Sequence, residues 1–164
     1  MICPEHTRLD QSADFVNHFA HLVLGQATIE SSVGNLLGDF MRGVDIRSLP
    51  PAVKLGLENH RAVDRFTDAD EGIRTLKHLF SKQRRRFAGV ALDIWFDHLL
   101  LQHWAQFESG DLNRVIEKFY QHLREGRELM PPSMCRITRL MVETDWFGHY
   151  RDIVSIAGAM VRVA

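Results

Sequence analysis

The sequence is poor in the residues on which several classes of protein depend. Only two cysteines, Cys3 and Cys135, occur among 164 residues. The chain therefore needs no disulfide framework, and a reducing compartment is expected. The formal net charge is -1, which gives no general attraction to nucleic acid or to anionic membranes. These shortages argue against a disulfide-rich secreted domain and predict no nucleic-acid partner.

Long apolar runs and several catalytic signatures are also missing. No stretch approaches the roughly 20 apolar residues of a membrane-spanning helix, and the opening MICPEHTRLDQSAD carries Glu, Asp and His where a signal peptide needs an apolar run. We find no glycine-rich phosphate loop, no CxxC pair and no GxSxG elbow. We therefore expect a cytoplasmic protein with no membrane partner, whose function depends on other side chains.

Helical periodicity is what the sequence does contain. With 45% apolar and 25% charged residues, the chain can bury one core, and no useful alternating strand pattern occurs. Short connections between the apolar segments predict an all-α fold, a compact bundle of about eight helices. The expected helices cover residues 16–28, 33–43, 50–68, 71–83, 89–107, 112–129, 133–147 and 149–161.

Local signals mark several of these boundaries. Pro50 and Pro51 suit the first turn of a helix. Asp70 is a typical N-cap for the following helix, and Gly43 is placed to end the second. No repeat, low-complexity tract or domain linker is evident, so a single domain is expected.

Histidine and aspartate interrupt the first two apolar helices. His18 and His21 lie three residues apart in NHFAHL, and Asp39 is flanked by apolar residues in NLLGDF. Each is a candidate ligand for a metal ion. Histidines in such a setting are also common as core or surface residues without a ligand, so the pattern leaves both interpretations open.

The stretch ENHRAVDRFTD places His60 and Asp64 on one face of the third helix, with Asp68 one turn further on. Such spacing suits a metal or phosphate site. It would equally suit a solvated surface pair that contributes only a few tenths of a kcal/mol.

The fifth helix carries Asp93 and Asp97 four residues apart, followed by His98, in the apolar run LDIWFDHLLLQHW. A buried carboxylate without a partner costs several kcal/mol or becomes protonated, so it requires a cation, a hydrogen-bond donor or a metal. Asp97 could therefore be a metal ligand, or it could cap a helix or pair with an arginine.

Together these positions predict a divalent metal site between helices. Mixed carboxylate and imidazole ligands suit manganese, iron or zinc better than calcium. A metal held in this way polarises a phosphoryl oxygen and lowers the pKa of a bound water, which suits ester hydrolysis.

The densest positive charge is the run KQRRRF, with Lys82, Arg84, Arg85 and Arg86. Most such runs are solvated helix ends. Arginine forks also pair with carboxylates and phosphates, so the run is a candidate docking surface for an acidic partner.

Four segments in order resemble the acyl carrier protein phosphodiesterase family, also called acyl carrier protein hydrolases. They are NHFAHL, ESSVGNLLGDFMRG, LPPAVKLGLENHRAVDRFTD and RRRFAGVALDIWFDHLLLQHW. The combination of GNLLGDF, HRxxDxxTD and LDxxxDHxLxxHW is specific, and the resemblance extends from about residue 16 to residue 159. The family is similar to the HD-type metal-dependent phosphohydrolases, which implies an all-helical, HD-domain-like fold.

The resemblance implies that the chain hydrolyses the phosphodiester between 4′-phosphopantetheine and a serine of holo-acyl carrier protein. The implied cofactor is Mn²⁺, with Mg²⁺ or Fe²⁺ as alternatives. Two other functions stay open: an HD-type phosphohydrolase of a small phosphoester or nucleotide, and a carrier-binding module without catalysis.

Individual residues take roles from the same resemblance. The implied metal ligands are His21, Asp39, His60, Asp64 and Asp97. The implied catalytic residues are Asp39, His60, Asp64, Asp97 and His98. Arg61 would hold the substrate phosphate, Asp93 would lie on the substrate side, and the basic run at Lys82, Arg84, Arg85 and Arg86 would face the acidic carrier protein.

Two departures from the family pattern concern the ends of the chain. Family members tend to begin near NHFAHL with methionine where this chain has Val16, so residues 1–15 are expected to be a disordered extension and residues 16–164 the phosphohydrolase domain. Family members also continue for a few helical turns beyond AGAM. An apolar face left uncovered by that difference would favour a homodimer.

Overall fold

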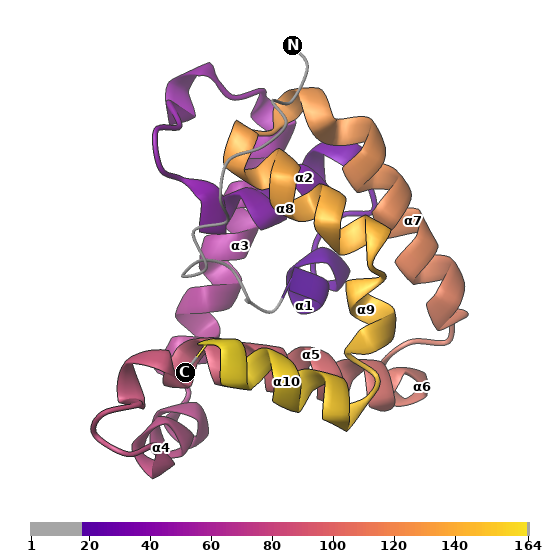
Figure 1. The fold of residues 1–164 in the computed structure, drawn as a ribbon. Helices are drawn as coiled ribbons and strands as arrows, with labels where there is room; N and C mark the ends of the chain where they lie inside the picture. Colours follow the sequence, from indigo (N-terminus) through magenta and orange to yellow (C-terminus); the bar gives the residue numbers. More distant parts are fainter. Residues whose placement is uncertain (1–17, 164) are drawn as a thin grey trace.

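The computed structural model describes residues 18–163, and these form an all-α bundle (Figure 1). No strand occurs in this range, so the expected fold class is confirmed. The α-helices are α1 (His18–Val23), α2 (Ile29–Leu37), α3 (Pro51–Ala69), α4 (Glu71–Leu79), α5 (Ala88–Gln102), α6 (Trp104–Phe107), α7 (Leu112–Glu125), α8 (Pro132–Glu143), α9 (Trp146–His149) and α10 (Ile153–Val163). Short 3₁₀ helices cover Gly38–Phe40, Ile46–Ser48, Arg85–Phe87 and Gly126–Leu129.

Ten described α-helices replace the expected eight because two expected helices are each divided. The run 89–107 breaks at His103, whose backbone (φ −107°, ψ 20°) leaves the helical region between α5 and α6. The segment 133–147 breaks before α9 at Asp145, which adopts the left-handed conformation with φ 48° and ψ 57°. Neither break falls at a glycine or a proline in the sequence.

The expected starts of α3 and α4 are confirmed to within one residue, but α4 ends at Leu79 instead of residue 83, and both expected ends of α2 are wrong because it ends at Leu37. α3 has proline in its first turn, and the Asp70 side chain accepts a hydrogen bond from the backbone N–H of Ile73 at 3.0 Å. α2 begins earlier than residue 33 because Thr28 caps it, accepting from the N–H of Ser31 at 3.2 Å. Gly43 takes a positive φ of 78° in the turn that follows.

α2 and α3 make the most extensive helix pairing, and glycines allow it. A Cβ atom on Gly34 would lie 2.2 Å from the carbonyl oxygen of Val53 and 2.8 Å from the Cα of Gly56. A side chain on Gly56 would meet Gly34 in the same way. The two backbones are therefore in direct contact, which fixes how far α3 can lie from α2.

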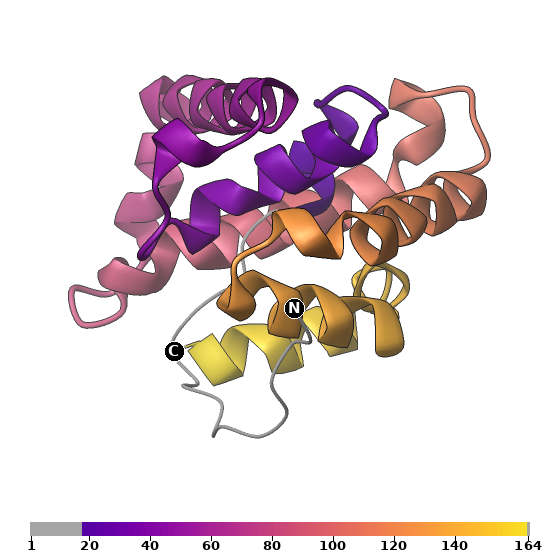
Figure 2. The same cartoon turned by 90° about the horizontal axis from the view of Figure 1, so that it is seen from above.

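α1 lies near the centre of the bundle and packs against α2 and α5 (Figure 1). Phe19 of α1 is fully buried and contacts the rings of Trp104, Phe119 and Phe147, so α7, α6 and α9 close around it. α10 packs on α5. Figure 2 shows α3 and α10 at opposite edges of the molecule, with α2 between them.

Two surface features bear on function. Among the described residues no helix is long and apolar enough to cross a bilayer. α4 has no buried residue and lies at a corner of the molecule, and Leu79 at its end is 77% exposed. The expected extension at residues 1–15 lies outside the described residues, and the homodimer stays a prediction.

Candidate metal centre

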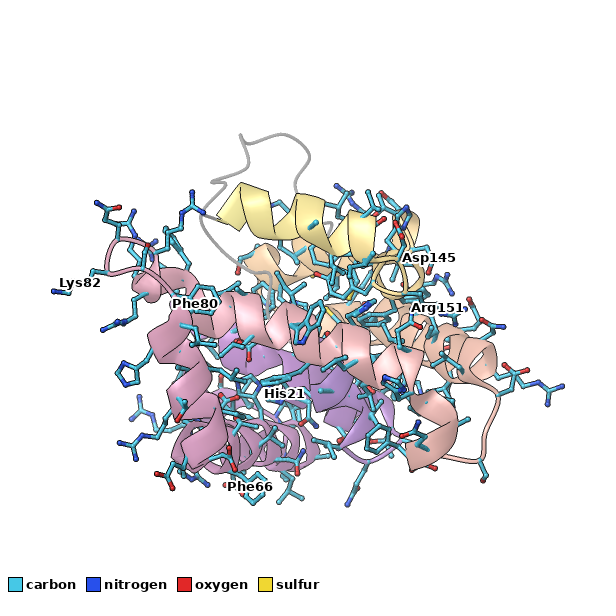
Figure 3. All side chains as sticks on the ribbon, turned by 90° about the horizontal axis from the view of Figure 1, so that it is seen from below. His21, Phe66, Phe80, Lys82, Asp145 and Arg151 are labelled. Carbon is cyan, nitrogen blue, oxygen red and sulfur yellow. The ribbon has the colours of Figure 1, made fainter. Side chains whose placement is uncertain are left out.

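Three of the predicted ligands meet at one point, between α1 and the middle of α3. Nε2 of His21 lies 3.2 Å from Oδ1 of Asp64, and Nε2 of His60 lies 3.0 Å from Oδ2 of the same carboxylate. The two imidazole rings stack with centroids 4.0 Å apart. Figure 3, seen from below, places His21 next to α5, which α1 contacts.

The donor set of this cluster fits a divalent metal ion. One nitrogen or oxygen from each of His21, His60 and Asp64 lies within 4.8 Å of the other two. Both histidines are buried, while the Asp64 side chain is 46% exposed. Neutral imidazole nitrogens and a carboxylate are the usual ligands of manganese, iron and zinc, and the exposed side leaves access for a substrate phosphate.

A second carboxylate, Asp39, links the cluster to a further histidine. Its Oδ1 lies 3.8 Å from Nε2 of His60, and its Oδ2 lies 3.6 Å from Nδ1 of His18. His18 is completely buried, and its ring lies parallel to those of Phe40 and Trp146. The sequence offers His18 as a candidate ligand beside His21, but the structure does not bring it into the group of His21, His60 and Asp64. Asp39 thus lies between His18 and His60.

The electrostatics of the cluster follow from burial and from the shared carboxylate. Burial and the neighbouring His60 hold the pKa of His21 below its ordinary value, although Asp64 opposes this. Burial also lowers the pKa of His60, but Asp64 and Asp39 outweigh it, so this pKa lies above its ordinary value. The two histidines hold the pKa of Asp64 well below the usual carboxyl range against the effect of burial. Of the two histidines, His60 therefore keeps its proton to the higher pH in the metal-free cluster.

Gly38 makes room for the His60 ring, a role that the sequence pattern did not reveal. A Cβ atom at Gly38 would lie 2.0 Å from Cδ2 and 2.1 Å from Nε2 of His60. The Gly38 backbone is ordinary right-handed helix, with φ −50° and ψ −36°. Glycine is therefore required here for space, and conformational freedom does not enter.

Asp97 contacts the backbone of α1, and its assignment as a metal ligand stays a prediction. This fully buried carboxylate accepts hydrogen bonds from the backbone N–H groups of Phe19 at 3.0 Å and Ala20 at 2.9 Å. Burial raises the pKa of Asp97 to about 8, and the two backbone donors act against that rise. Asp97 thus caps the first turn of α1 from α5, the alternative left open by the sequence, and it lies outside the three-residue group.

We expect Asp97→Ala to lower the free energy of unfolding by about 1–3 kcal/mol, since two buried backbone N–H groups would lose their acceptor. Chemical denaturation measures this loss. The folded variant should still bind metal at saturating concentration, because His21, His60 and Asp64 remain. A folded Asp97→Ala protein that binds no metal would restore Asp97 to the ligand set.

His98 also points away from the cluster. Its Nδ1 donates to the carbonyl oxygen of Tyr150 at 2.7 Å, joining α5 to the end of α9. Successive residues of a helix point about 100° apart, so Asp97 and His98 cannot both face α1. The structure supports a structural role for His98, and its catalytic role stays a prediction.

Asp93 lies beside the cluster, one turn before Asp97. Burial raises the pKa of Asp93 to about 7, with a further contribution from the charge of Asp64, while Lys77 acts in the other direction. Arg61 follows His60 on α3 but is exposed. Its predicted contact with a substrate phosphate, like the substrate-side role of Asp93, stays a prediction.

The basic run lies apart from the cluster, in the connection between α4 and α5. Its four cationic side chains are all exposed, and the Arg86 guanidinium lies over the Phe87 ring at 4.5 Å from the centroid. Figure 3 shows Lys82 at the outer edge of the molecule. The run is therefore accessible to a binding partner, and its role in docking an acidic partner stays a prediction.

Comparison with known proteins identifies close sequence relatives. The sequence model of the family "Acyl carrier protein phosphodiesterase" matches residues 16–164. A protein of that name from Serratia proteamaculans is 32% identical over 150 residues, which cover 91% of this chain and 78% of the relative. One from Escherichia coli O139:H28 is 34% identical over 153 residues, with the same two coverages. No solved structure gives a significant match.

Proposed function

The chain belongs to the acyl carrier protein phosphodiesterase family and is a phosphodiesterase, and we propose that the cluster of His21, His60 and Asp64 is its catalytic centre. The proposed reaction is hydrolysis of the phosphodiester that joins 4′-phosphopantetheine to a serine of holo-acyl carrier protein. Its products are apo-acyl carrier protein and free 4′-phosphopantetheine. The convergence of two buried histidines on one half-exposed carboxylate is the observation that carries the proposal.

We propose that these three residues hold a divalent metal, with Mn²⁺ as the first choice and Mg²⁺ or Fe²⁺ as alternatives. Two imidazoles favour manganese or iron over magnesium, which prefers oxygen ligands. A bound metal would supply Lewis-acid activation of a phosphoryl oxygen and a water of lowered pKa. An HD-type ancestry agrees with this set and remains part of the proposal.

The other residues near the cluster position these donors. Asp39 lies between the rings of His60 and His18, and its Oδ1 is 3.8 Å from the same Nε2 of His60 that faces Asp64, so we keep it as a candidate further ligand. Asp97 holds the first turn of α1, and with it His21, against α5. Asp93 lies on the neighbouring α5, and its carboxyl group interacts electrostatically with Asp64 and His60. It is our candidate for proton transfer at the substrate, since a carboxyl group with a pKa of about 7 can exchange protons near neutral pH.

The carrier protein would dock on the corner formed by α4 and the basic run. Arg84, Arg85 and Arg86 are exposed, and so are Leu76 and Leu79 of the adjoining α4. An exposed apolar strip next to arginines suits a helical acidic partner, because the arginines attract carboxylates while the apolar side chains are covered.

Reversing the charge of this run should weaken substrate docking without affecting the metal. In the variant Arg84→Glu, Arg85→Glu, Arg86→Glu we expect KM for holo-acyl carrier protein to rise at least tenfold, with unchanged metal content. Steady-state kinetics at low and high salt measure this, since screening should weaken docking of the wild type. A control with the same charge change, at Arg47, Arg114 and Lys118, should keep the wild-type KM. Equal kinetics of the two triple variants would refute the docking assignment.

The proposed function is tested by incubating the purified protein with holo-acyl carrier protein and Mn²⁺. Mass spectrometry of the carrier should show metal-dependent loss of phosphopantetheine, and a chelator should stop it. Metal binding without carrier hydrolysis would favour a small phosphoester as the substrate. A folded protein with neither metal binding nor hydrolysis would leave the carrier-binding module.

A further inference from the structure

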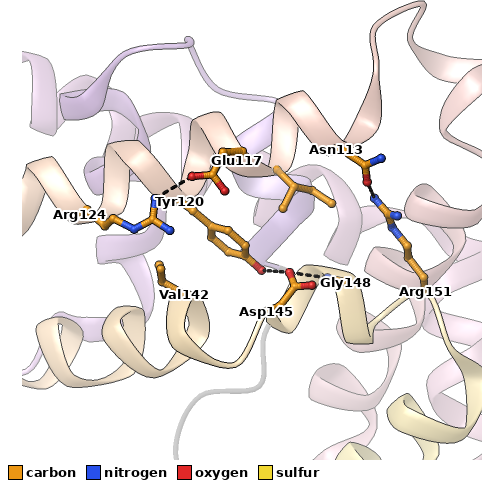
Figure 4. A pocket seen from close by; sticks show the side chains of 9 residues that line it. Asn113, Glu117, Tyr120, Arg124, Val142, Asp145, Gly148 and Arg151 are labelled. Carbon is orange, nitrogen blue, oxygen red and sulfur yellow. Dashed lines mark hydrogen bonds and ion pairs between the residues drawn. The ribbon is translucent and has the colours of Figure 1, made fainter.

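A pocket lies between α7, α8 and α9, helices that supply none of the three residues of the metal centre (Figure 4). Its cavity volume is about 300 Å³, which suits a small molecule. Figure 3 shows Asp145 and Arg151 of this pocket far from Lys82 of the basic run. Glu117, Tyr120, Arg124, Asp145 and Arg151 are among the residues that line it.

Both carboxylates of the pocket already have donors within it. Glu117 pairs with Arg124, with Oε1 and Nη1 2.8 Å apart. Asp145 accepts hydrogen bonds at Oδ1 from the Tyr120 hydroxyl at 2.9 Å and from the N–H of Gly148 at 3.2 Å. The two carboxylates therefore do not require a cationic ligand.

Arg151, in contrast, has a neutral partner only. Its Nη2 donates to the amide oxygen of Asn113 at 2.7 Å, and no carboxylate among the described residues forms an ion pair with it. Its Nε is buried and finds no hydrogen-bond acceptor within the described part of the chain. A buried donor left in this way usually costs about 1–3 kcal/mol, and an anion in the pocket would remove that cost.

The arginine is also held in place. Its backbone carbonyl accepts a hydrogen bond from the Gln102 side chain of α5, while Asn113 of α7 holds the guanidinium. At the pocket edge Asp145 keeps a left-handed backbone (φ 48°), which a non-glycine residue adopts at a cost. The fold therefore maintains a strained turn and a fixed guanidinium around one small cavity.

We propose that this pocket binds a small molecule carrying an oxyanion, a carboxylate or a phosphate group, with Arg151 as its anchor. The Nε–H and the remaining Nη donors of Arg151 would bind the oxyanion. The apolar side chains of Ile116 and Val142 would contact the body of the ligand. This site is separate from the metal centre and does not rest on the proposed function.

The test uses the full chain in the presence of a chelator, so that no metal-bound anion contributes. Nuclear magnetic resonance follows the Arg151 Nε–H signal during separate titrations with inorganic phosphate, acetate and chloride at constant ionic strength. We expect a saturable shift in the millimolar range with phosphate or acetate and none with chloride. The more effective anion identifies the preferred oxyanion.

Variants decide whether Arg151 is the anchor. Backbone signals of Asn113 and Gly148 should report the same titration, at least tenfold weaker in Arg151→Gln and unchanged in Arg139→Gln, a surface arginine on α8 next to Glu143. If Arg151→Gln does not fold, Arg151→Lys and the wild-type titration take its place. The absence of a saturable shift in the wild type, or equal affinity in the folded variants, would overturn the proposal and leave an adventitious ion only.

Discussion

Replacing Asp64 by asparagine is expected to abolish stoichiometric metal binding and to lower kcat/KM for carrier hydrolysis at least a hundredfold. Asp64 supplies the only carboxylate of the three-residue group, and each of its oxygens lies near one histidine. Asparagine keeps the size of the side chain but has no charge to offset a cation and only one acceptor oxygen. Metal analysis and steady-state kinetics measure both effects.

Asp68→Asn is the matched control for this experiment. Asp68 lies one turn further along α3, is exposed, and pairs with Lys77 at 2.7 Å outside the cluster. We expect wild-type metal content and rate from this variant. An Asp64→Asn protein that keeps its metal and most of its activity would show that the cluster is not the catalytic centre.

The metal-free proteins provide a second readout of the same substitution. Asp64 raises the pKa of His60 against the effect of burial, so its removal should let burial lower that pKa. Because protons compete with metal for the imidazole nitrogen, the raised pKa means that wild-type metal affinity begins to fall at a higher pH, on acidification, than it would for an ordinary histidine. Histidine titration by nuclear magnetic resonance should show the lower His60 pKa in Asp64→Asn.

The second large effect is expected from a single methyl group. Gly38→Ala should lower metal affinity and kcat/KM by at least a hundredfold, because the new Cβ would occupy the place of the His60 ring edge, 2.0 Å from Cδ2. His60 must then turn or α3 must shift, and either change moves its Nε2 away from Asp64. Overpacking of this kind also costs about 1–3 kcal/mol of stability, which chemical denaturation measures.

Gly89→Ala controls for the loss of glycine. Gly89 lies in α5, and a Cβ there would meet nothing within 4 Å. Alanine is the better helix former, so we expect unchanged activity and a gain of up to about 1 kcal/mol in the free energy of unfolding. Normal metal binding by Gly38→Ala would mean that His60 is not held where the structure places it.

The sequence predicts the helices that have local signals and misses the breaks that do not. Pro51 and Asp70 mark the starts of α3 and α4, because an N-terminal proline and an N-cap aspartate act within one turn. The break at Asp145 depends on packing between distant segments, because the Tyr120 hydroxyl of α7 holds the Asp145 carboxylate. Such breaks cannot be derived from periodicity.

The same limit applies to the candidate site. Spacing and the family resemblance together predict His21, His60 and Asp64 as metal ligands, and the fold places these three side by side. They did not reveal that Asp97 accepts hydrogen bonds from two backbone N–H groups, because a buried carboxylate looks alike in sequence whether it meets a metal or such donors. Gly38 escaped notice for a related reason, since the volume that it leaves empty belongs to a ring 22 positions away in the chain.

The glycine contact between α2 and α3 has a consequence for metal uptake. Gly34 touches Gly56, and one turn later on both helices Gly38 touches His60. The ring of this histidine therefore packs directly on the Gly38 backbone, with no other side chain in between. Its ring is preorganised before any ion arrives, so little conformational entropy remains to be lost on binding. We therefore expect the protein to rearrange little when the proposed metal centre is filled.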